Sequence, residues 1–511
     1  MHTGNTKIRF NDGALKLMQL NPAESQGRLV VPGTTVWDLP QDALVYSFNA
    51  TSLEHKWCRA TALVRRENVQ LLQVKMASGS TFQVEFDRPI LAYSAGKVRL
   101  VNPMEAKRLC LPSIRKFARC FPEQDKVFAH GKSGRGGGAV SHGIPLNPRT
   151  GLFLGLLIGD GCVTQAGQVF LYGGGWKTRN RKIFANISGC GDLPYSGVTC
   201  TTRFESEGLA GTTKMSTRTV IANHVWFSRW LRNRIGDDAL SKRIPDFCFN
   251  APDDHLWGLF DGLISSDGSV SVNGSKRQKP QLLVSFSTSS PQLVEGFKKL
   301  CERLTLRCSV SPYRSEQSGL PAYIINVSTR DLAKAHDHYP VSFVHPTKNA
   351  IFRRWIGRVT LEGPGVTGDQ VPFPAELEKA FKQAYAWQHE RRRLPNGKTD
   401  FGPFPTFKYN GHWGRGTARR YVDVHGRFTT WPQPSATYLA ILADESIGWD
   451  KVVEITAVRE ASTSWNVVVP GADAIALESG LLVPTHPQSF SATHPPHYTY
   501  ASLAAFHTPP A

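Results

Sequence analysis

The first part of the chain contains short runs in which hydrophobic and polar residues alternate, separated by turn residues. Between residues 29 and 112, these runs fall at residues 43–48, 71–76, 80–86, 90–93 and 97–101. Alternation with a period of two places every second side chain on the same face of a strand. The pattern therefore predicts an all-β unit. The Gly-rich basic stretch at residues 131–138 cannot bury a core, and it predicts a flexible boundary after that unit.

From about residue 145 to residue 355 the pattern changes to alternating helices and strands, and it repeats. The first copy predicts strands at residues 168–172, 198–205 and 217–222 and helices at residues 180–187 and 224–235. The second predicts strands at residues 282–287, 307–312 and 323–328 and helices at residues 292–304 and 330–336. An apolar helix opens each copy, so both follow the order helix, two strands, helix, two strands, helix. Two pseudo-symmetric halves are expected, at about residues 150–236 and 255–340.

The C-terminal third differs in composition from both of these regions. Residues 356–447 look like an insertion that opens on a Pro/Gly-rich stretch and continues into a basic helix predicted at residues 375–393. Between Lys379 and Tyr421 there are ten Lys and Arg residues against two acidic ones. Residues 448–486 return to β-alternation. The tail at residues 487–511, which is rich in Pro, His, Ser and Thr, is expected to be disordered.

Composition and charge narrow the possible partners. The 511 residues include 60 Lys and Arg against 41 Asp and Glu, which gives a formal net charge of +19, and 41% are hydrophobic. That hydrophobic content excludes wholesale disorder, and the positive excess favours a polyanion such as nucleic acid. The longest apolar stretch, residues 151–159, is about half as long as a membrane span. No secretory signal or Cys-x-x-Cys pair is present, so we expect an intracellular protein in the cytoplasm, or in the nucleus of a eukaryote.

The two apolar helices that open the repeats end in the same way. The first copy contains Phe-Leu-Gly-Leu-Leu-Ile-Gly-Asp160-Gly, and the second contains Phe-Asp-Gly-Leu-Ile-Ser-Ser-Asp267-Gly. Gly155 and Gly262 lack Cβ atoms, which allows the helices to pack closely. A carboxylate at a helix C-terminus opposes the macrodipole at a cost of about 0.3–1 kcal/mol, so its repetition indicates function. Two such carboxylates, with the backbone carbonyls of Gly159 and Ser266, predict a site of hard oxygen ligands for Mg²⁺.

These paired motifs resemble the signature of the LAGLIDADG homing endonucleases in their double-motif, single-chain form. The resemblance implies that Asp160 and Asp267 are metal ligands and catalytic residues. The sixth motif position, often Asp in that family, is Ile158 in the first copy and Ser265 in the second. An isolated amphipathic core helix ending in an Asp-Gly turn would explain one motif. It explains two at this spacing much less well.

A second match concerns a lysine between the two halves. The block Ser-Lys242-Arg-Ile-Pro-Asp resembles the Lys-x-Ile-Pro block that precedes the second motif in intein-type members, where the lysine belongs to the active site. An ammonium group near the scissile phosphate can orient water and offset developing negative charge. Lys348, in His-Pro-Thr-Lys348, is the candidate counterpart in the second half. The alternative for each is a solvated lysine next to a turn.

Residues 29–112 together with residues 449–486 resemble the split Hint fold, the self-splicing fold of inteins. The block that normally contains Thr-x-x-His carries Glu85 and Arg88 at those two positions. Val30 lies where a nucleophilic Cys or Ser would begin the fold. Thr485 lies near the expected His-Asn end. Splicing needs an activated nucleophile and an Asn that cyclises, so the Hint part is predicted to be inactive.

The predicted fold is multidomain α+β: a pseudo-symmetric double αββαββα LAGLIDADG endonuclease at residues 145–355, inserted into an all-β Hint-like domain at residues 1–135 and 448–486. The resemblance implies a site-specific, Mg²⁺-dependent endonuclease that cleaves double-stranded DNA at a long recognition site. It is expected to act as a monomer that forms a pseudo-dimer, without a membrane partner. The alternatives are a DNA- or RNA-binding protein that does not cleave, such as a regulator or maturase, and an active splicing element.

The basic insertion supplies the candidate DNA-backbone contacts. Phosphate binding requires cations, and aromatic residues are interleaved with them here. The alternative is a solvated charged face. The candidate residues are Arg391, Arg392, Arg393, Lys408, Arg415, Arg419 and Arg420.

Overall fold

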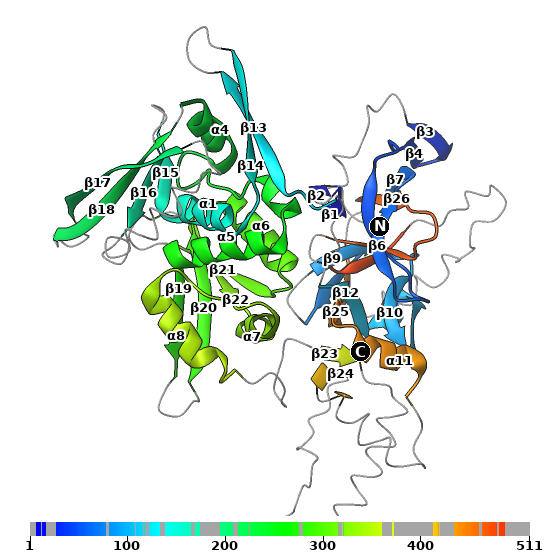
Figure 1. Cartoon of the computed structure of the whole chain (residues 1–511). Helices are drawn as coiled ribbons and strands as arrows, with labels where there is room; N and C mark the ends of the chain where they lie inside the picture. The colour runs from blue at the N-terminus through cyan, green and yellow to red at the C-terminus, as the bar shows by residue number, and fades with distance from the viewer. Residues whose placement is uncertain are drawn as a thin grey trace, which may run out of the picture. The chain divides into compact units, whose positions relative to one another are not determined.

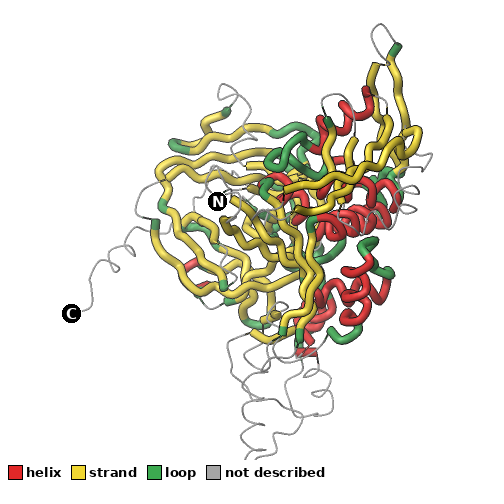
Figure 2. The backbone as a smooth tube through the Cα atoms, turned by 90° about the vertical axis from the view of Figure 1, so that its left-hand side faces the viewer, coloured by secondary structure: helices red, strands yellow, loops and turns green. Residues whose placement is uncertain are grey.

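The computed structural model divides into two compact units (Figure 1). Unit 1 comprises Met1–Cys120 and Glu362–Ala511, and unit 2 comprises Phe121–Leu361. The structure describes residues 7–11, 13–16, 27–77, 81–107, 109–115, 117, 122–132, 138–164, 169–173, 195–207, 213–223, 225–274, 280–314, 319, 321–359, 370–372, 412–416, 418–419, 434–458, 462–477 and 480–485. Strands dominate unit 1, and most of the helices belong to unit 2 (Figure 2). The chain is thus a mixed α/β protein.

The described residues of unit 1 form three larger antiparallel sheets. Their strand orders are β11-β10-β12-β25-β8-β9, then β2-β1-β5-β27-β28 with β6 paired to β5, and β26-β7-β4-β3. A short pair, β23 with β24, also belongs to this unit. The strands are β1 Lys7–Phe10, β2 Gly13–Lys16, β3 Arg28–Val31, β4 Thr34–Asp38, β5 Leu44–Phe48, β6 His55–Arg59, β7 Ala62–Val69, β8 Leu71–Met76, β9 Thr81–Glu85, β10 Ile90–Ser94, β11 Lys97–Val101, β12 Cys110–Ile114, β23 Gln370–Pro372, β24 His412–Gly414, β25 Ile447–Ala457, β26 Ser462–Val468, β27 Ala474–Ala476 and β28 Leu482–Pro484. The helices are η3 Pro103–Ala106 and α11 Ala436–Ala443.

The two ends of the sequence fold together in unit 1. Strand β25 pairs with β12 on one side, with Leu111 opposite Asp450, and with β8 on the other. Strand β26 pairs with β7, and β27 pairs with β5. Segments from both sides of residues 121–361 therefore share the same sheets in unit 1. All five alternating runs coincide with strands.

Unit 2 begins with a hairpin and continues through two similar halves. The hairpin is β13 Lys126–Lys132 and β14 Ala139–Pro145. The first half comprises α1 Pro148–Asp160, β15 Gly161–Val163, β16 Val169–Gly173, β17 Tyr195–Glu207, β18 Thr213–Asn223 and α4 Val225–Ile235. The second, after η4 Asp246–Asn250, comprises α5 Asp253–Ser266, β19 Gly268–Asn273, β20 Gln281–Thr288, α6 Pro291–Arg303, β21 Cys308–Arg314, β22 Pro321–Val327 and α7 Thr329–His338, followed by α8 Pro346–Ile356.

The internal symmetry predicted from the sequence is present in the strand order. The first sheet has the order β15-β16-β18-β17, and the second has the equivalent order β19-β20-β22-β21. Helices α1 and α5, one from each half, lie side by side near the middle of unit 2 (Figure 1). Helix α1 begins at a capping box in which the Asn147 side chain accepts from the backbone N–H of Thr150.

The helix and strand predictions for unit 2 are largely confirmed, with two differences. Strands β15 and β19, which begin at the glycine of each Asp-Gly pair, were not among the predicted ranges, because each merges in sequence with the motif before it. The second difference concerns the boundary predicted at residues 131–138: Lys132 of β13 pairs with Ala139 of β14 within unit 2, and residues 133–137 lie outside the described residues. The helix predicted at residues 180–187, the one at residues 375–393 and the tail after residue 486 lie outside the described residues.

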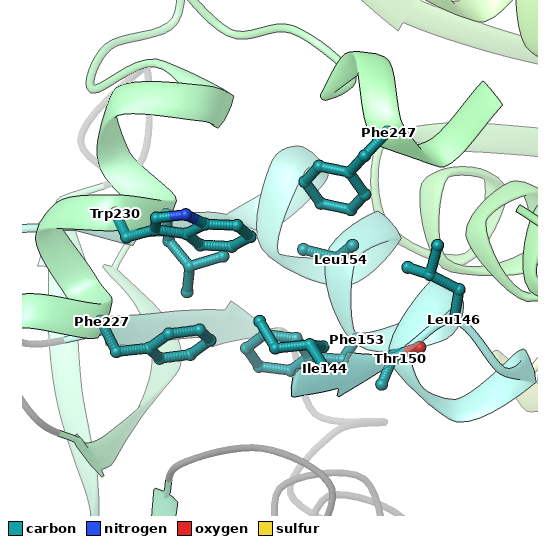
Figure 3. Close-up of a pocket in the computed structure, with 9 residues that line it drawn as sticks. Ile144, Leu146, Thr150, Phe153, Leu154, Phe227, Trp230 and Phe247 are labelled. Atoms are coloured by element: carbon teal, nitrogen blue, oxygen red, sulfur yellow. The ribbon is translucent and has the colours of Figure 1, made fainter. Parts of the chain in front are cut away.

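The hydrophobic core of unit 2 includes a small apolar cavity in the first half (Figure 3). Phe227 and Trp230 of α4 and Phe153 and Leu154 of α1 line it, with further residues from β14, the turn after it and η4. No charged side chain lines this cavity, so it belongs to the packing of α4 against α1. No helix in the described part of the chain is long and apolar enough to cross a membrane.

Candidate functional site

Helices α1 and α5 approach each other so closely that their backbones touch. A Cβ atom on Gly155 would lie 2.8 Å from the Cα of Gly262, and one on Gly151 would lie 2.1 Å from the carbonyl oxygen of His255. One on Gly258 would lie 2.2 Å from the carbonyl oxygen of Pro148. These glycines recur every four residues on the facing sides of the two helices. Only residues without side chains fit there, and the close packing predicted for Gly155 and Gly262 is confirmed.

The same contact brings the C-terminal ends of the two helices together. A Cβ atom on Gly159 would lie 1.8 Å from Ser266 Oγ and 3.6 Å from the backbone nitrogen of Asp267. Asp160 is the last residue of α1, and Asp267 is the C-cap of α5. Asp160 is partly exposed and Asp267 is exposed. The structure therefore places the two motif carboxylates on neighbouring helix ends that solvent reaches.

Both lysines singled out in the sequence reach these helix ends. The ammonium group of Lys242 donates to the carbonyl oxygen of Gly159. The ammonium group of Lys348, at the start of α8, donates to the carbonyl oxygens of Ile264, Ser265 and Ser266 at 2.9, 3.0 and 3.0 Å. Lys242 and Gly159 are 83 residues apart, and Lys348 and Ser266 are 82 residues apart. The lysines occupy equivalent positions in the two halves.

The lysine contacts change the electrostatics of the two helix ends. An ammonium group at a helix C-terminus interacts favourably with the macrodipole, whereas a carboxylate there does not. Each end thus carries a cation that offsets the unfavourable placement of Asp160 or Asp267. A negatively charged ligand approaching the carboxylates would meet two ammonium groups on the same surface.

The donor set suits a hard divalent cation, although the protein supplies few ligands. Among the described residues, no three His, Cys, Asp or Glu side chains come together to hold a metal ion. The two carboxylates would therefore be joined by main-chain carbonyls, water and ligand oxygens, as is usual for Mg²⁺. The carbonyls of Gly159 and Ser266 already accept from the lysines. Since a carbonyl oxygen has two lone pairs, each retains one for a second partner.

A polar network that sequence reasoning missed supports Lys348. Asp261 Oδ1 accepts from Ser265 Oγ at 2.7 Å and from the backbone N–H of Val344 at 2.8 Å. Ser265 Oγ accepts from the backbone N–H of His345 at 3.2 Å. Burial raises the pKa of Asp261 to about 7. Asp261 and Ser265 are polar residues within the otherwise apolar helix α5, and this departure from the apolar pattern is the signal that could have revealed the network.

A buried histidine lies in the first turns of α1 and α5, away from the carboxylates. His255 is fully buried, and its Nδ1 lies 3.1 Å from the carbonyl oxygen of Asn147 and 3.2 Å from Thr150 Oγ1. Its Nε2 has no hydrogen-bond partner in the described structure. Burial lowers the pKa of His255 to about 4, because the apolar surroundings disfavour the charged ring. The imidazole is therefore neutral and structural.

The structure corrects one predicted DNA contact and places only two of the seven candidates. Arg415 is 1% exposed, and its guanidinium donates to the carbonyl oxygens of Ile441, Leu442 and Ile447. It is buried against the C-terminal end of α11 and cannot reach a phosphate. Arg419 donates to the carbonyl of Leu442 at 2.7 Å and remains partly exposed. The remaining candidates, Arg391, Arg392, Arg393, Lys408 and Arg420, lie outside the described residues.

A buried ion cluster includes Glu85 and Arg88, the two residues found where the resemblance to the Hint fold would require Thr and His. Glu85 is fully buried, pairs with Arg66 and accepts from Ser464 Oγ, while Arg88 Nε lies 3.5 Å from the Glu85 carboxylate. The Thr485 hydroxyl donates to the carbonyl of Ala472 at 2.8 Å. Each of these groups has a structural role in the sheets of unit 1.

Comparison with known families agrees with this geometry. Residues 254–338, which run from the start of α5 to the end of α7, match the family model of the LAGLIDADG-like domain. The family match covers the second half of the double unit, including Asp267, and the first half repeats its strand order.

The chain is also similar to parts of several known proteins. A DNA polymerase from Thermococcus hydrothermalis is 26% identical over 165 residues, which is 32% of this chain and 9% of the polymerase. A crystal structure of an intein from a hyperthermophile matches 22% of this chain and 71% of its own, at 22% identity and a TM-score of 0.20. The structure of I-DmoI in complex with DNA and Mn matches 38% of this chain and 96% of its own, at 15% identity and a TM-score of 0.25.

Proposed function

We propose that this protein is a site-specific, Mg²⁺-dependent endonuclease that cleaves both strands of double-stranded DNA, derived from an intein that no longer splices. One observation carries the proposal: two motif carboxylates lie on adjoining helix ends, and each end is contacted by a lysine. A hydrolase that cuts two antiparallel strands needs two such sets of groups, related by approximate twofold symmetry. The two halves would provide this symmetry within a monomer acting inside the cell, without a membrane partner.

Asp160 and Asp267 would hold the divalent cations, with the carbonyl oxygens of Gly159 and Ser266 as further donors. A bound cation supplies a Lewis acid and lowers the pKa of a coordinated water. Lys242 and Lys348 would orient the scissile phosphates and offset the negative charge that develops on their oxygens. The glycine contacts between α1 and α5 keep the two sets of groups at a fixed separation, which sets the spacing of the two cuts.

The sheet of the second half offers a surface suited to base edges. Its exposed side chains are mostly uncharged hydrogen-bonding groups, which can donate and accept in the major groove. Ser269 and Asn273 on β19, Ser309 and Ser311 on β21, and Asn326 on β22 are all exposed. This face would select sequence, and cations elsewhere on the strongly basic chain would bind phosphates.

Cleavage of the source genome tests this proposal. The purified full chain is incubated with genomic DNA of its source, with Mg²⁺ or with EDTA, and the new DNA ends are sequenced. We expect one or a few recurrent double-strand breaks that require the metal. Binding without breaks at any divalent ion concentration would instead support a regulator or maturase.

The loss of splicing has its own test. The chain is expressed in frame inside a reporter, and the reporter is analysed on a blot. No ligated reporter is expected, because neither Val30 nor Thr485 can supply the acyl shift or the Asn cyclisation. Ligated product would show that unit 1 still splices.

A further inference from the structure

The two lysines at the helix ends are supported by different sets of residues. Lys348 follows a turn whose backbone N–H groups donate hydrogen bonds to side chains of α5. Asp261 Oδ1 accepts from the N–H of Val344 at 2.8 Å, and Ser265 Oγ accepts from the N–H of His345 at 3.2 Å. His345 is the N-cap of α8, so these two bonds fix the start of the helix that carries Lys348.

Among the described residues, the first half has no equivalent of this polar network. The positions that correspond to Asp261 and Ser265 are Leu154 and Ile158, and both are buried in the core. Lys242 is instead fixed through its own carbonyl oxygen, which accepts from Ser290 Oγ at 2.6 Å. Ser290 is fully buried and is the N-cap of α6. Ser290 thus supports Lys242, whereas Asp261 and Ser265 support the turn that leads to Lys348.

We infer that Asp261 and Ser290 are positioning residues that act separately on the two DNA strands, Asp261 through Lys348 and Ser290 through Lys242. This inference rests on the proposed endonuclease function. A displacement of about 1 Å of a group that contacts the reacting phosphate can cost up to about a hundredfold in rate. Loss of either support should slow the cut served by the lysine that it positions and leave the other cut close to the wild-type rate. A nicked intermediate should then accumulate.

The variants follow from the structure. Asp261→Leu introduces the residue that the first half has at this position, and it removes the acceptor for Val344. Asp261→Asn keeps an oxygen acceptor there and serves as the conservative variant. Ser290→Ala removes the bond to the Lys242 carbonyl. Ser328→Ala is the matched control, because Ser328 is also a helix N-cap in the second half, at α7, and its hydroxyl accepts from the N–H of Asp331.

The experiment uses the full chain and a supercoiled plasmid that carries the target sequence, followed by denaturing gels with each strand labelled. We expect Asp261→Leu to slow one strand by about tenfold to a hundredfold, Ser290→Ala to slow the opposite strand, and Asp261→Asn to recover most of the lost rate. Ser328→Ala should leave the ratio of the two rates unchanged. Equal slowing of both strands, or slowing of the same strand by both variants, would overturn the inference.

A second measurement keeps the inference testable if the wild-type chain cuts no DNA, an outcome that would refute only the proposed function. Hydrogen exchange is followed by mass spectrometry in peptides that cover residues 340–350. Asp261→Leu should accelerate exchange there, since the amide of Val344 loses its acceptor and Ser265 Oγ, the acceptor for His345, loses the carboxylate to which it donates, while Ser290→Ala should not. Unchanged exchange in Asp261→Leu would show that Asp261 does not hold this turn.

Discussion

Gly159 of α1 and Ser266 of α5 meet where the two motif helices end, and there is room for only one side chain between them. A Cβ atom on Gly159 would lie 1.8 Å from Ser266 Oγ and 2.6 Å from Ser266 Cβ. This contact sets how closely the ends that carry Asp160 and Asp267 can approach. A helix pair that separates here would change the distance between the two sets of groups assigned to cleavage.

Exchanging the two residues tests this contact. We expect Gly159→Ala to destabilise the protein by about 1–3 kcal/mol through overpacking and to reduce cleavage strongly. The double variant Gly159→Ala with Ser266→Gly moves the side chain to the other helix and should regain most of both properties. Thermal unfolding and cleavage assays measure the effects.

Gly357→Ala is the control for the exchange, because a Cβ there meets nothing within 4 Å and the backbone is right-handed helical. It should leave stability and cleavage unchanged. If the double variant were no better than Gly159→Ala, the Gly159–Ser266 contact would not be the cause of the loss.

The buried His255 predicts a pH dependence of stability. Its pKa is about 4 in the folded chain against an ordinary value of 6.5, so below about pH 6.5 the unfolded chain binds a proton that the folded chain excludes. This contribution therefore lowers the free energy of unfolding by up to about 3 kcal/mol as the pH falls from 6.5 to 4. In His255→Asn, the free energy of unfolding should fall less between pH 6.5 and 4, by about that amount. Denaturant unfolding across this pH range measures the free energy of unfolding of both proteins. If it fell equally with pH in the wild type and the variant, His255 would not be the source of the pH dependence.

Much of the architecture could be predicted because period and spacing are local properties of the sequence. The apolar helices ending in Asp-Gly, the strand ranges and the two-half organisation all follow from such patterns. The hydrogen bonds that position Lys242 and Lys348 could not be predicted in this way. Ser290 lies 48 residues from Lys242 and Val344 lies 83 residues from Asp261, so only the folded chain brings these groups together.

Charge along the sequence was a poorer guide than hydrophobic pattern. Arg415 belongs to a basic run that suggested DNA contact, yet its guanidinium donates to the carbonyls of Ile441 and Leu442 at the end of α11. Sequence alone does not distinguish a buried arginine that caps a helix from one that faces solvent. The backbone carbonyls that need donors at a helix C-terminus provide the physical reason for its burial.

Arg415 and the neighbouring arginines should therefore behave differently when replaced. Arg415→Met should lower the free energy of unfolding by about 2–3 kcal/mol, because it leaves buried carbonyls without donors, and it should not change the salt dependence of DNA binding. Replacing Arg391, Arg392 and Arg393 with Gln should flatten the slope of log K against log salt by up to about 2.7, at unchanged stability. DNA-binding titrations at several salt concentrations measure the slopes. A flatter salt slope in Arg415→Met, or a loss of stability in the triple variant, would refute this account.

Cleavage by the two aspartate variants, measured together with binding, tests the central claim most directly. Asp160→Asn and Asp267→Asn each replace one carboxylate with a neutral amide of the same shape, which is a far poorer ligand for a hard cation. On one target duplex with Mg²⁺, we expect each variant to bind with an affinity close to that of the wild type and to make no double-strand breaks. Double-strand cleavage at the wild-type rate in both variants would show that these carboxylates do not form the active site.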